Sequence, residues 1–189
     1  MGRYETLKHY QMKNTNIPYM NPEEIVDLVC YLTKQTVMLE IGGGKSSIFL
    51  SRIVKELVTV EHDRGWANEI SNSPDLDLTA WKLHVVEPNW PQSHCFQPAE
   101  PGQFDDYVNF ISTLEDNKFN VVLIDGRDRV RSTLASLPKI KNGGIVIIHD
   151  FWNRPKYHSL LNNPQLELIE DKNSFGKIPS NTLVAFRKK

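Results

Sequence analysis

The sequence predicts an α/β fold in which a mostly parallel sheet is covered by helices on both faces. Five apolar runs lack the alternation of a half-exposed strand, and such runs are typical of parallel strands buried on both sides. Helical periodicity lies between them, which predicts repeated strand–helix units. Two further strand-like runs follow with no helical pattern between them, so we expect a C-terminal antiparallel hairpin and seven strands in all.

The elements can be assigned in order along the 189 residues. Residues 1–20 are polar with scattered aromatics, so we expect an N-terminal arm or lid, followed by a single domain at 21–189. Residues 21–24, Asn-Pro-Glu-Glu, predict a helix start with an N-cap, a proline and two acids. The predicted strands lie at 37–41, 57–60, 83–86, 120–124, 145–148, 166–169 and 182–186. Further helices are predicted at 46–56, 66–70, 104–114 and 129–140.

Residues 37–47, Val-Met-Leu-Glu-Ile-Gly-Gly-Gly-Lys-Ser-Ser, form the most informative stretch of the chain. A buried strand passes through three glycines into a helix, and a second strand then ends in Glu61. This order predicts a nucleoside-binding half-site, because glycines let the backbone approach a ligand where a Cβ would clash. An acid in the position of Glu61 can accept hydrogen bonds from both hydroxyls of a ribose.

Several ligand classes compete for this glycine turn. An ATP or GTP P-loop would need a glycine five positions before Gly44, where the chain has Leu39 inside the strand. A dinucleotide fingerprint fits Gly42 and Gly44 but has Ser47 in place of its third glycine. That departure disfavours a small NAD(P)-binding reductase without excluding it. A tight turn that binds no ligand also stays open.

The remaining form is acid-x-Gly-x-Gly-x-Ser, supplied by Glu40, Gly42, Gly44 and Ser46. It resembles the first motif of class I S-adenosylmethionine (SAM)-dependent methyltransferases, and the resemblance spans about residues 21–187. It implies a Rossmann-like fold and SAM as the cofactor. Acids near the turn suit the ammonium and sulfonium charges of SAM. The residues that the resemblance implies for SAM binding are Glu40, Gly42, Gly44, Ser46, Ser47, Glu61 and Glu87.

An acid closes each of the five predicted parallel strands, and these acids are Glu40, Glu61, Glu87, Asp125 and Asp150. In an open α/β sheet the strand ends share one edge, where ligands bind. Clustered carboxylates repel one another, so we expect a cationic ligand, a metal ion or both at this edge.

The segment at 125–154 resembles metal-assisted O-methyltransferases of sugars and catechols more narrowly. That resemblance implies catalytic roles for Asp125 and Asp150, which would hold a magnesium ion that lowers the pKa of an acceptor hydroxyl. Sugar-modifying relatives carry a second acid where this chain has His149. Histidine is a poor magnesium ligand and could instead be the general base of a metal-free site. Whether Asp125 or His149 is the base, and whether a divalent cation is needed, both stay open.

Candidate acceptor contacts flank the same edge. Trp90 and Trp152 could stack on a sugar face, although aromatic residues also fill ordinary cores. Arg127 and its neighbours could bind a carboxylate or a phosphate, although a solvated helix face would also explain them. The predicted acceptor contacts are Trp90, His94, Arg127, Trp152 and Arg154.

The charge and the hydropathy of the chain disfavour several classes of function. The formal net charge of -1 disfavours a broad nucleic-acid or anionic-membrane surface. No apolar run approaches the ~18 residues of a transmembrane helix, and a signal-peptide core is lacking, so we expect a cytoplasmic protein without membrane insertion. The expected function is O-methylation of a hydroxyl on a small molecule, a sugar or a glycan, by a monomer or an oligomer. A non-catalytic SAM-fold interaction module stays open.

Overall fold

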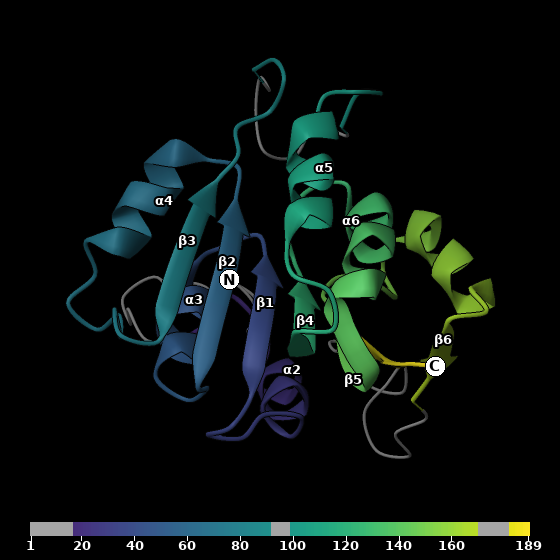
Figure 1. The fold of residues 1–189 in the computed structure, drawn as a ribbon, viewed down its shortest axis with the longest axis horizontal. Coiled ribbons are helices and arrows are strands. Elements are labelled where there is room, and N and C mark those ends of the chain that lie inside the picture. The colour runs from purple at the N-terminus through teal and green to yellow at the C-terminus, as the bar shows by residue number, and fades with distance from the viewer. Residues whose placement is uncertain (1–16, 92–98, 170–181) are drawn as a thin grey trace, which may run out of the picture.

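The computed structural model describes residues 17–91, 99–169 and 182–189 of the chain. Within these ranges seven strands form one sheet in the order β3-β2-β1-β4-β5-β7-β6 (Figure 1). Strands β1 to β5 run parallel, whereas β7 pairs antiparallel with both β5 and β6. The predicted fold class is confirmed. The strands are β1 (Val37–Ile41), β2 (Glu56–Glu61), β3 (Trp81–Val85), β4 (Phe119–Ile124), β5 (Ile140–Ile148), β6 (Leu166–Leu168) and β7 (Val184–Lys188).

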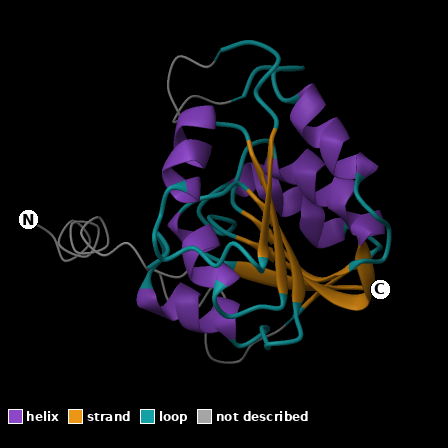
Figure 2. Ribbon diagram, turned by 60° about the vertical axis from the view of Figure 1, so that its left-hand side comes forward, coloured by secondary structure: helices purple, strands orange, loops and turns teal. Residues whose placement is uncertain are grey.

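Helices cover both faces of the sheet, as Figure 2 shows. One face carries α2 (Pro22–Val29), α3 (Lys45–Ser51) and α4 (Arg64–Ser71). The other face carries α5 (Asp105–Thr113), α6 (Arg129–Ser136) and the 3-10 helices η1 (Leu137–Lys139) and η2 (Pro155–Asn162). Successive strand residues point to opposite faces, so Met38 packs with Leu28 of α2, and Leu39 belongs to the cluster of Tyr107 of α5.

Strand β1 has the predicted bounds, and the other six strands differ from theirs by one to five residues at one or both ends. The differences at β3 and β5 bear on the site. The sequence predicts the third strand at 83–86, but β3 ends at Val85, which leaves Glu87 two residues beyond it. The fifth strand starts at Ile140 rather than at residue 145. Residues 142–144, Asn-Gly-Gly, are typical of the end of a helix, but they form a bulge within β5. Gly143 in this bulge has φ +74, a left-handed conformation that glycine adopts without strain.

Three segments that bear on the predictions lie outside the described residues. They are most of the predicted N-terminal arm, the loop that contains His94, and the connection between β6 and β7. The division into an arm at 1–20 and a domain at 21–189 therefore stays a prediction. In the described ranges no helix combines the length and the apolar character that crossing a membrane requires.

The strand order places a topological switch between β1 and β4. From β1 the chain builds β2 and β3 on one side, and it then crosses over to build β4 and β5 on the other (Figure 1). The helices that follow β1 and β4 therefore lie on opposite faces of the sheet, and a crevice lies beside the turns that lead into them. Ligands of open α/β sheets bind at such a switch point.

Candidate active site

Two glycines bring the turns after β1 and β4 into contact. Gly42 has φ +93, and a Cβ on it would lie 2.4 Å from the Cα of Gly126. A Cβ on Gly126 would in turn lie 2.4 Å from the hydroxyl oxygen of Tyr107. The N–H groups of Asp125 and Gly126 both donate to the carbonyl oxygen of Ile41, at 2.8 and 2.6 Å. The two turns therefore pack backbone to backbone, and a side chain at either glycine would force them apart.

Glu40 is fully buried near the glycine turn. Its carboxylate accepts hydrogen bonds from Ser46 Oγ at 2.6 Å, Ser47 Oγ at 2.6 Å and Thr59 Oγ1 at 2.9 Å. Ser47 Oγ also accepts the N–H of Gly44 at 3.0 Å. The sequence predicts SAM contacts for all of these residues except Thr59. The structure places them in an internal network that braces the turn, and none of them lines the cavity of this crevice.

The buried position of Glu40 changes its acidity. Burial raises the pKa of Glu40 to about 7, although the hydroxyl donors Ser46, Ser47 and Thr59 favour the anion. The ordinary value of 4.5 applies to the unfolded chain, so the folded protein binds this proton more tightly. The resulting stabilisation is complete below pH 4.5 and is lost as the pH rises through about 7.

We therefore expect Glu40→Gln to remove one source of pH-dependent stability. The free energy of unfolding of the wild type should fall by about 3 kcal/mol, relative to that of the variant, between acidic and mildly alkaline pH. Glutamine stays neutral and keeps a carbonyl oxygen for the serine and threonine hydroxyls. Urea unfolding of both proteins at several pH values measures the difference. Parallel pH profiles for the two proteins would contradict the titration of a buried Glu40.

Glu61, at the end of β2, is buried and lines the cavity. Its Oε2 accepts the N–H of Gly43 at 2.6 Å, and its Oε1 accepts the N–H of Asp63 at 2.7 Å. His62 Nδ1 lies 2.9 Å from the same Oε1. The indole Nε1 of Trp66 donates to the carbonyl oxygen of Gly43 at 3.0 Å. Because a carboxylate can accept about four hydrogen bonds, Glu61 retains acceptor capacity for a ligand.

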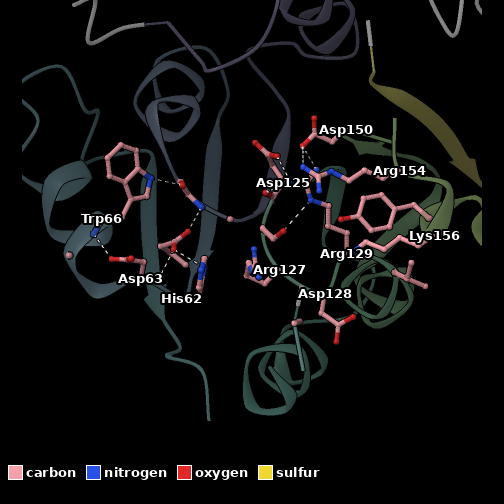
Figure 3. Close-up of a pocket in the computed structure, with 18 residues that line it drawn as sticks. His62, Asp63, Trp66, Asp125, Arg127, Asp128, Arg129, Asp150, Arg154 and Lys156 are labelled. Atoms are coloured by element: carbon pink, nitrogen blue, oxygen red, sulfur yellow. Dashed lines mark hydrogen bonds and ion pairs between the residues drawn. The ribbon is translucent and has the colours of Figure 1, made fainter. Parts of the chain in front are cut away.

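A cavity of about 800 Å³ lies in the crevice, a size that suits a small-molecule site. One wall comes from residues after β2 and from α4, and the other comes from the ends of β4 and β5, from α6 and from η2. Figure 3 shows the two walls, with His62, Asp63 and Trp66 on one side, Arg154 and Lys156 on the other, and Asp125 between them.

Besides Glu40, Gly44, Ser46 and Ser47, three further predicted contacts lie away from this cavity. Glu87 is exposed and pairs with the first residue of α4 at 2.8 Å. Trp90 is 40% exposed, and its Nε1 donates to Glu100 at 3.2 Å. Trp152 packs edge-on against Phe151, with 5.1 Å between the ring centroids. The two tryptophans therefore do not form a stacking platform in the cavity.

The predicted catalytic and acceptor residues gather mostly on the β4 and β5 side. Asp125 and Asp150 line the cavity, as do the arginines Arg127 and Arg154. Arg154 donates from Nη2 to Asp150 Oδ2 at 3.1 Å. His149, which the sequence predicts as a possible base, is not among the lining residues.

His149 lies between two carboxylates. Its Nδ1 is 2.9 Å from Asp125 Oδ1, and its Nε2 is 3.3 Å from Glu24 Oε2. Burial acts to lower the pKa of His149, but Asp125 and Glu24 outweigh burial and raise it to about 10. For Asp125, burial acts to raise the pKa, but His149 and Arg129 outweigh it and lower the pKa. At neutral pH the ring is therefore an imidazolium that donates from both nitrogens, and Asp125 is the anion that lines the cavity.

Glu24 is a residue whose place in the site the sequence analysis missed. It is buried, and its Oε1 accepts the N–H and Oγ1 of Thr182 at 2.7 and 2.8 Å. Its Oε2 accepts the N–H of Asn21 at 2.9 Å, which closes a capping box at the start of α2. Burial acts to raise the pKa of Glu24, but His149 and these backbone donors lower it overall. The capping pattern is visible in the sequence, whereas the contact with His149 is not.

Asp63 and Gly126 also line the cavity without having been predicted, whereas Arg129 is one of the neighbours of Arg127 that the sequence offers as a possible contact to an anion. Asp63 caps α4 by accepting the N–H of Trp66 at 2.8 Å, so its sequence signal is that of a helix start. Gly126 directly follows the acid that closes β4, and this Asp-Gly pair was the available signal for the second turn. Arg129, the first residue of α6, lies between Asp125 and Asp150 and is only 10% exposed.

Comparison with known proteins gives a family and a fold. A family model described as "Methyltransferase domain" matches residues 39–151. A methyltransferase-like protein from Silicibacter pomeroyi is 22% identical, with 92% of this chain and 89% of that chain covered and a TM-score of 0.68. A candidate caffeoyl-CoA O-methyltransferase from Staphylococcus aureus is 12% identical, with 100% and 93% covered and a TM-score of 0.63.

A candidate methyltransferase from Streptococcus mutans, solved in complex with SAH, is 14% identical. The alignment covers 90% of this chain and 100% of that chain, with a TM-score of 0.54. No curated protein sequence matches the chain. At these identities the likeness to solved structures concerns the fold.

Proposed function

The chain belongs to the methyltransferase-domain family, and we propose that it transfers a methyl group from SAM to a hydroxyl of a small acceptor such as a sugar or glycan. One observation carries this proposal: a single cavity of about 800 Å³ joins Glu61 on one wall to the anionic Asp125 and its partners on the other. SAM would lie along the Glu61 wall, and the acceptor would lie along the wall of β4 and β5.

The Glu61 wall supplies the groups that a nucleoside requires. Glu61 is held in place by the N–H groups of Gly43 and Asp63, and its remaining lone pairs would accept the ribose hydroxyls. Gly42, Gly43 and Gly126 line the cavity without side chains, which leaves a passage from Glu61 toward Asp125. A sulfonium in that passage would be attracted by the carboxylate of Asp125.

The acceptor hydroxyl would attack the methyl carbon in line with the sulfur. A bond forms between the acceptor oxygen and the methyl carbon as the bond from carbon to sulfur breaks, and its electron pair stays on the sulfur. The proton of the hydroxyl passes to the carboxylate of Asp125. Because the pKa of Asp125 is lowered, this group is a weak base at neutral pH, so alignment of the reactants would supply much of the rate.

The proposed acceptor class has support from two sources. The resemblance of residues 125–154 to sugar O-methyltransferases supports a sugar as the acceptor. The carboxylate of Asp125 beside the cavity supports a hydroxyl as the methylated group, because it can take the proton of that hydroxyl. Arg127, Arg154 and Lys156 on the same wall would favour an acceptor that carries a carboxylate or a phosphate. Trp90 and Trp152 do not line the cavity, so they offer no stacking face for a sugar there.

Glu61→Ala should weaken the binding of S-adenosylhomocysteine by about 1–3 kcal/mol, because charge-assisted hydrogen bonds to the ribose are lost. Glu87→Ala is the matched control, since Glu87 also follows a parallel strand but pairs with Arg64 outside the cavity. Isothermal titration calorimetry measures both affinities, and thermal unfolding checks that each variant is folded. Equal losses in the two variants would remove Glu61 from the ribose site.

The proposal as a whole is tested with SAM that carries a labelled methyl group and a panel of hydroxyl acceptors that includes sugar acids and sugar phosphates. Transfer of label to an acceptor oxygen supports O-methylation. Binding of NADH without binding of S-adenosylhomocysteine would overturn the proposal in favour of a reductase. Binding of S-adenosylhomocysteine without transfer to any acceptor class would favour a non-catalytic module.

A further inference from the structure

We propose that the guanidinium of Arg129 is the resident cation of this site and stands where a divalent metal ion would bridge Asp125 and Asp150. The sequence predicts a metal ion there, and the ligand atoms available on Asp125, His149 and Asp150 all lie within 4.8 Å of one another. That spacing would suit a cation. The cation that the structure places between the two carboxylates is a side chain of the protein itself.

Arg129 contacts both carboxylates directly. Its Nη2 lies 2.9 Å from Asp125 Oδ1, and its Nη1 lies 3.5 Å from Asp150 Oδ2. The side chain is 10% exposed, so these contacts are little screened by water. A planar guanidinium can bridge two carboxylates because its nitrogens point in fixed, diverging directions.

The guanidinium is also fixed by backbone carbonyl groups at the strand ends. Nε donates to the carbonyl oxygen of Gly126 at 3.1 Å, and Nη2 donates to that of Asp125 at 3.0 Å. Nη1 donates to the carbonyl oxygen of His149. Every nitrogen of the group therefore has a backbone partner, and the turns after β4 and β5 both hold it in place.

The charges of the cluster already balance. The two carboxylates of Asp125 and Asp150 contact two permanently charged guanidinium groups, those of Arg129 and Arg154. A divalent ion would add two positive charges a few ångströms from the guanidinium, and this repulsion would have to be overcome. The Nδ1 of His149 is moreover directed at Asp125 Oδ1. With Arg129 in place, these residues do not fit a bridging metal ion.

Arg129 is thus a positioning residue that acts through Asp125. It stabilises the anionic form of Asp125 and fixes the orientation of its carboxylate relative to the cavity, two effects that a metal ion has on its ligands. The inference concerns ion binding, so it can fail or succeed whatever acceptor the protein methylates.

The experiment is a titration with Mn²⁺, followed by electron paramagnetic resonance, on the full chain and on four variants. One of these, the single variant Asp150→Asn, serves to locate any site found in the wild type. Mn²⁺ accepts carboxylate ligands, and its signal is lost when it binds. The wild type and Arg129→Lys should show no stoichiometric Mn²⁺ binding, because both keep the cation. Arg129→Ala should bind one Mn²⁺ at least about tenfold more tightly than the wild type, because two carboxylates lose their counter-ion. The double variant Arg129→Ala, Asp150→Asn should lose that gain.

Calorimetry with S-adenosylhomocysteine identifies which variants are folded and keep the cofactor half of the cavity. A wild type that binds one Mn²⁺, with the binding removed by Asp150→Asn, overturns the proposal. So does a folded Arg129→Ala variant that gains no Mn²⁺ site. If Arg129→Ala does not fold, the proposal is tested with the wild type and Arg129→Lys. An absence of stoichiometric Mn²⁺ binding in both proteins supports the proposal. Binding of one Mn²⁺ by the wild type overturns it.

Discussion

Asp125→Asn is expected to lower kcat by about 10²–10⁴-fold while S-adenosylhomocysteine still binds, because the amide cannot take the proton of the acceptor hydroxyl. The substitution should leave the local geometry intact. His149 Nδ1 and Arg129 Nη2 both approach Asp125 Oδ1 at 2.9 Å, and the carbonyl oxygen of asparagine can accept both contacts. The loss would then be a loss of chemistry rather than of structure.

Asp128→Asn provides the control for charge. Asp128 lines the same cavity but pairs with Arg131 at 3.0 Å, and its φ of +45 is one that asparagine tolerates. Its effect on kcat should be under about threefold, as for a rim charge that takes no part in proton transfer. Labelled methyl transfer from SAM measures both variants. An active Asp125→Asn protein together with an inactive His149→Ala protein would assign the base to His149 instead.

Gly42→Ala is expected to destabilise the fold by more than about 3 kcal/mol, since it combines backbone strain with overpacking. Gly42 has φ +93, and its added Cβ would lie 2.4 Å from both the Cα and the nitrogen of Gly126. These obstacles are backbone atoms, so relief requires β1 and β4 to separate. Binding of S-adenosylhomocysteine should be lost with the geometry of the turn.

Gly44→Ala is the matched control in the same turn. Its φ of 176 is ordinary extended backbone, and the nearest atom to an added Cβ would be Trp66 Nε1 at 3.4 Å. We expect a cost of less than about 1 kcal/mol for this change. Urea unfolding and calorimetry compare the two variants. Similar costs for both would mean that the contact between Gly42 and Gly126 does not constrain the fold.

The local sequence pattern predicts that the seven strands exist, but it predicts few of the residues at which they begin and end. The strand at Val37–Ile41 was predicted to the residue, because an apolar run is followed directly by glycines. The start of β5 was missed, because a bulge at 142–144 hides a strand behind residues that are typical of helix caps. Pairing between neighbouring strands decides where a strand begins and ends, and the sequence of one segment does not show how that segment pairs.

The site shows the same limit at the level of side chains. The spacing of the glycine motif located Glu40 and Glu61 near one turn, but spacing does not say which face of a strand a residue occupies. Glu40 points to the face covered by α3 and is satisfied by hydroxyl groups there, whereas Glu61 reaches the cavity. The environment of His149 depends on Glu24, which is 125 residues away, and no local pattern encodes that contact.

The bonds from Glu24 to Thr182 have a consequence for how the protein is made. They join residues 158 positions apart, and Thr182 lies just before the last strand of the sheet. A growing chain emerges N-terminal end first, so the wall that contains Glu61 can form while the segment that completes the Glu24 and His149 arrangement is still inside the ribosome. The arrangement of Glu24 and His149 beside Asp125 can therefore be completed only after Thr182 has left the ribosome and has paired with Glu24.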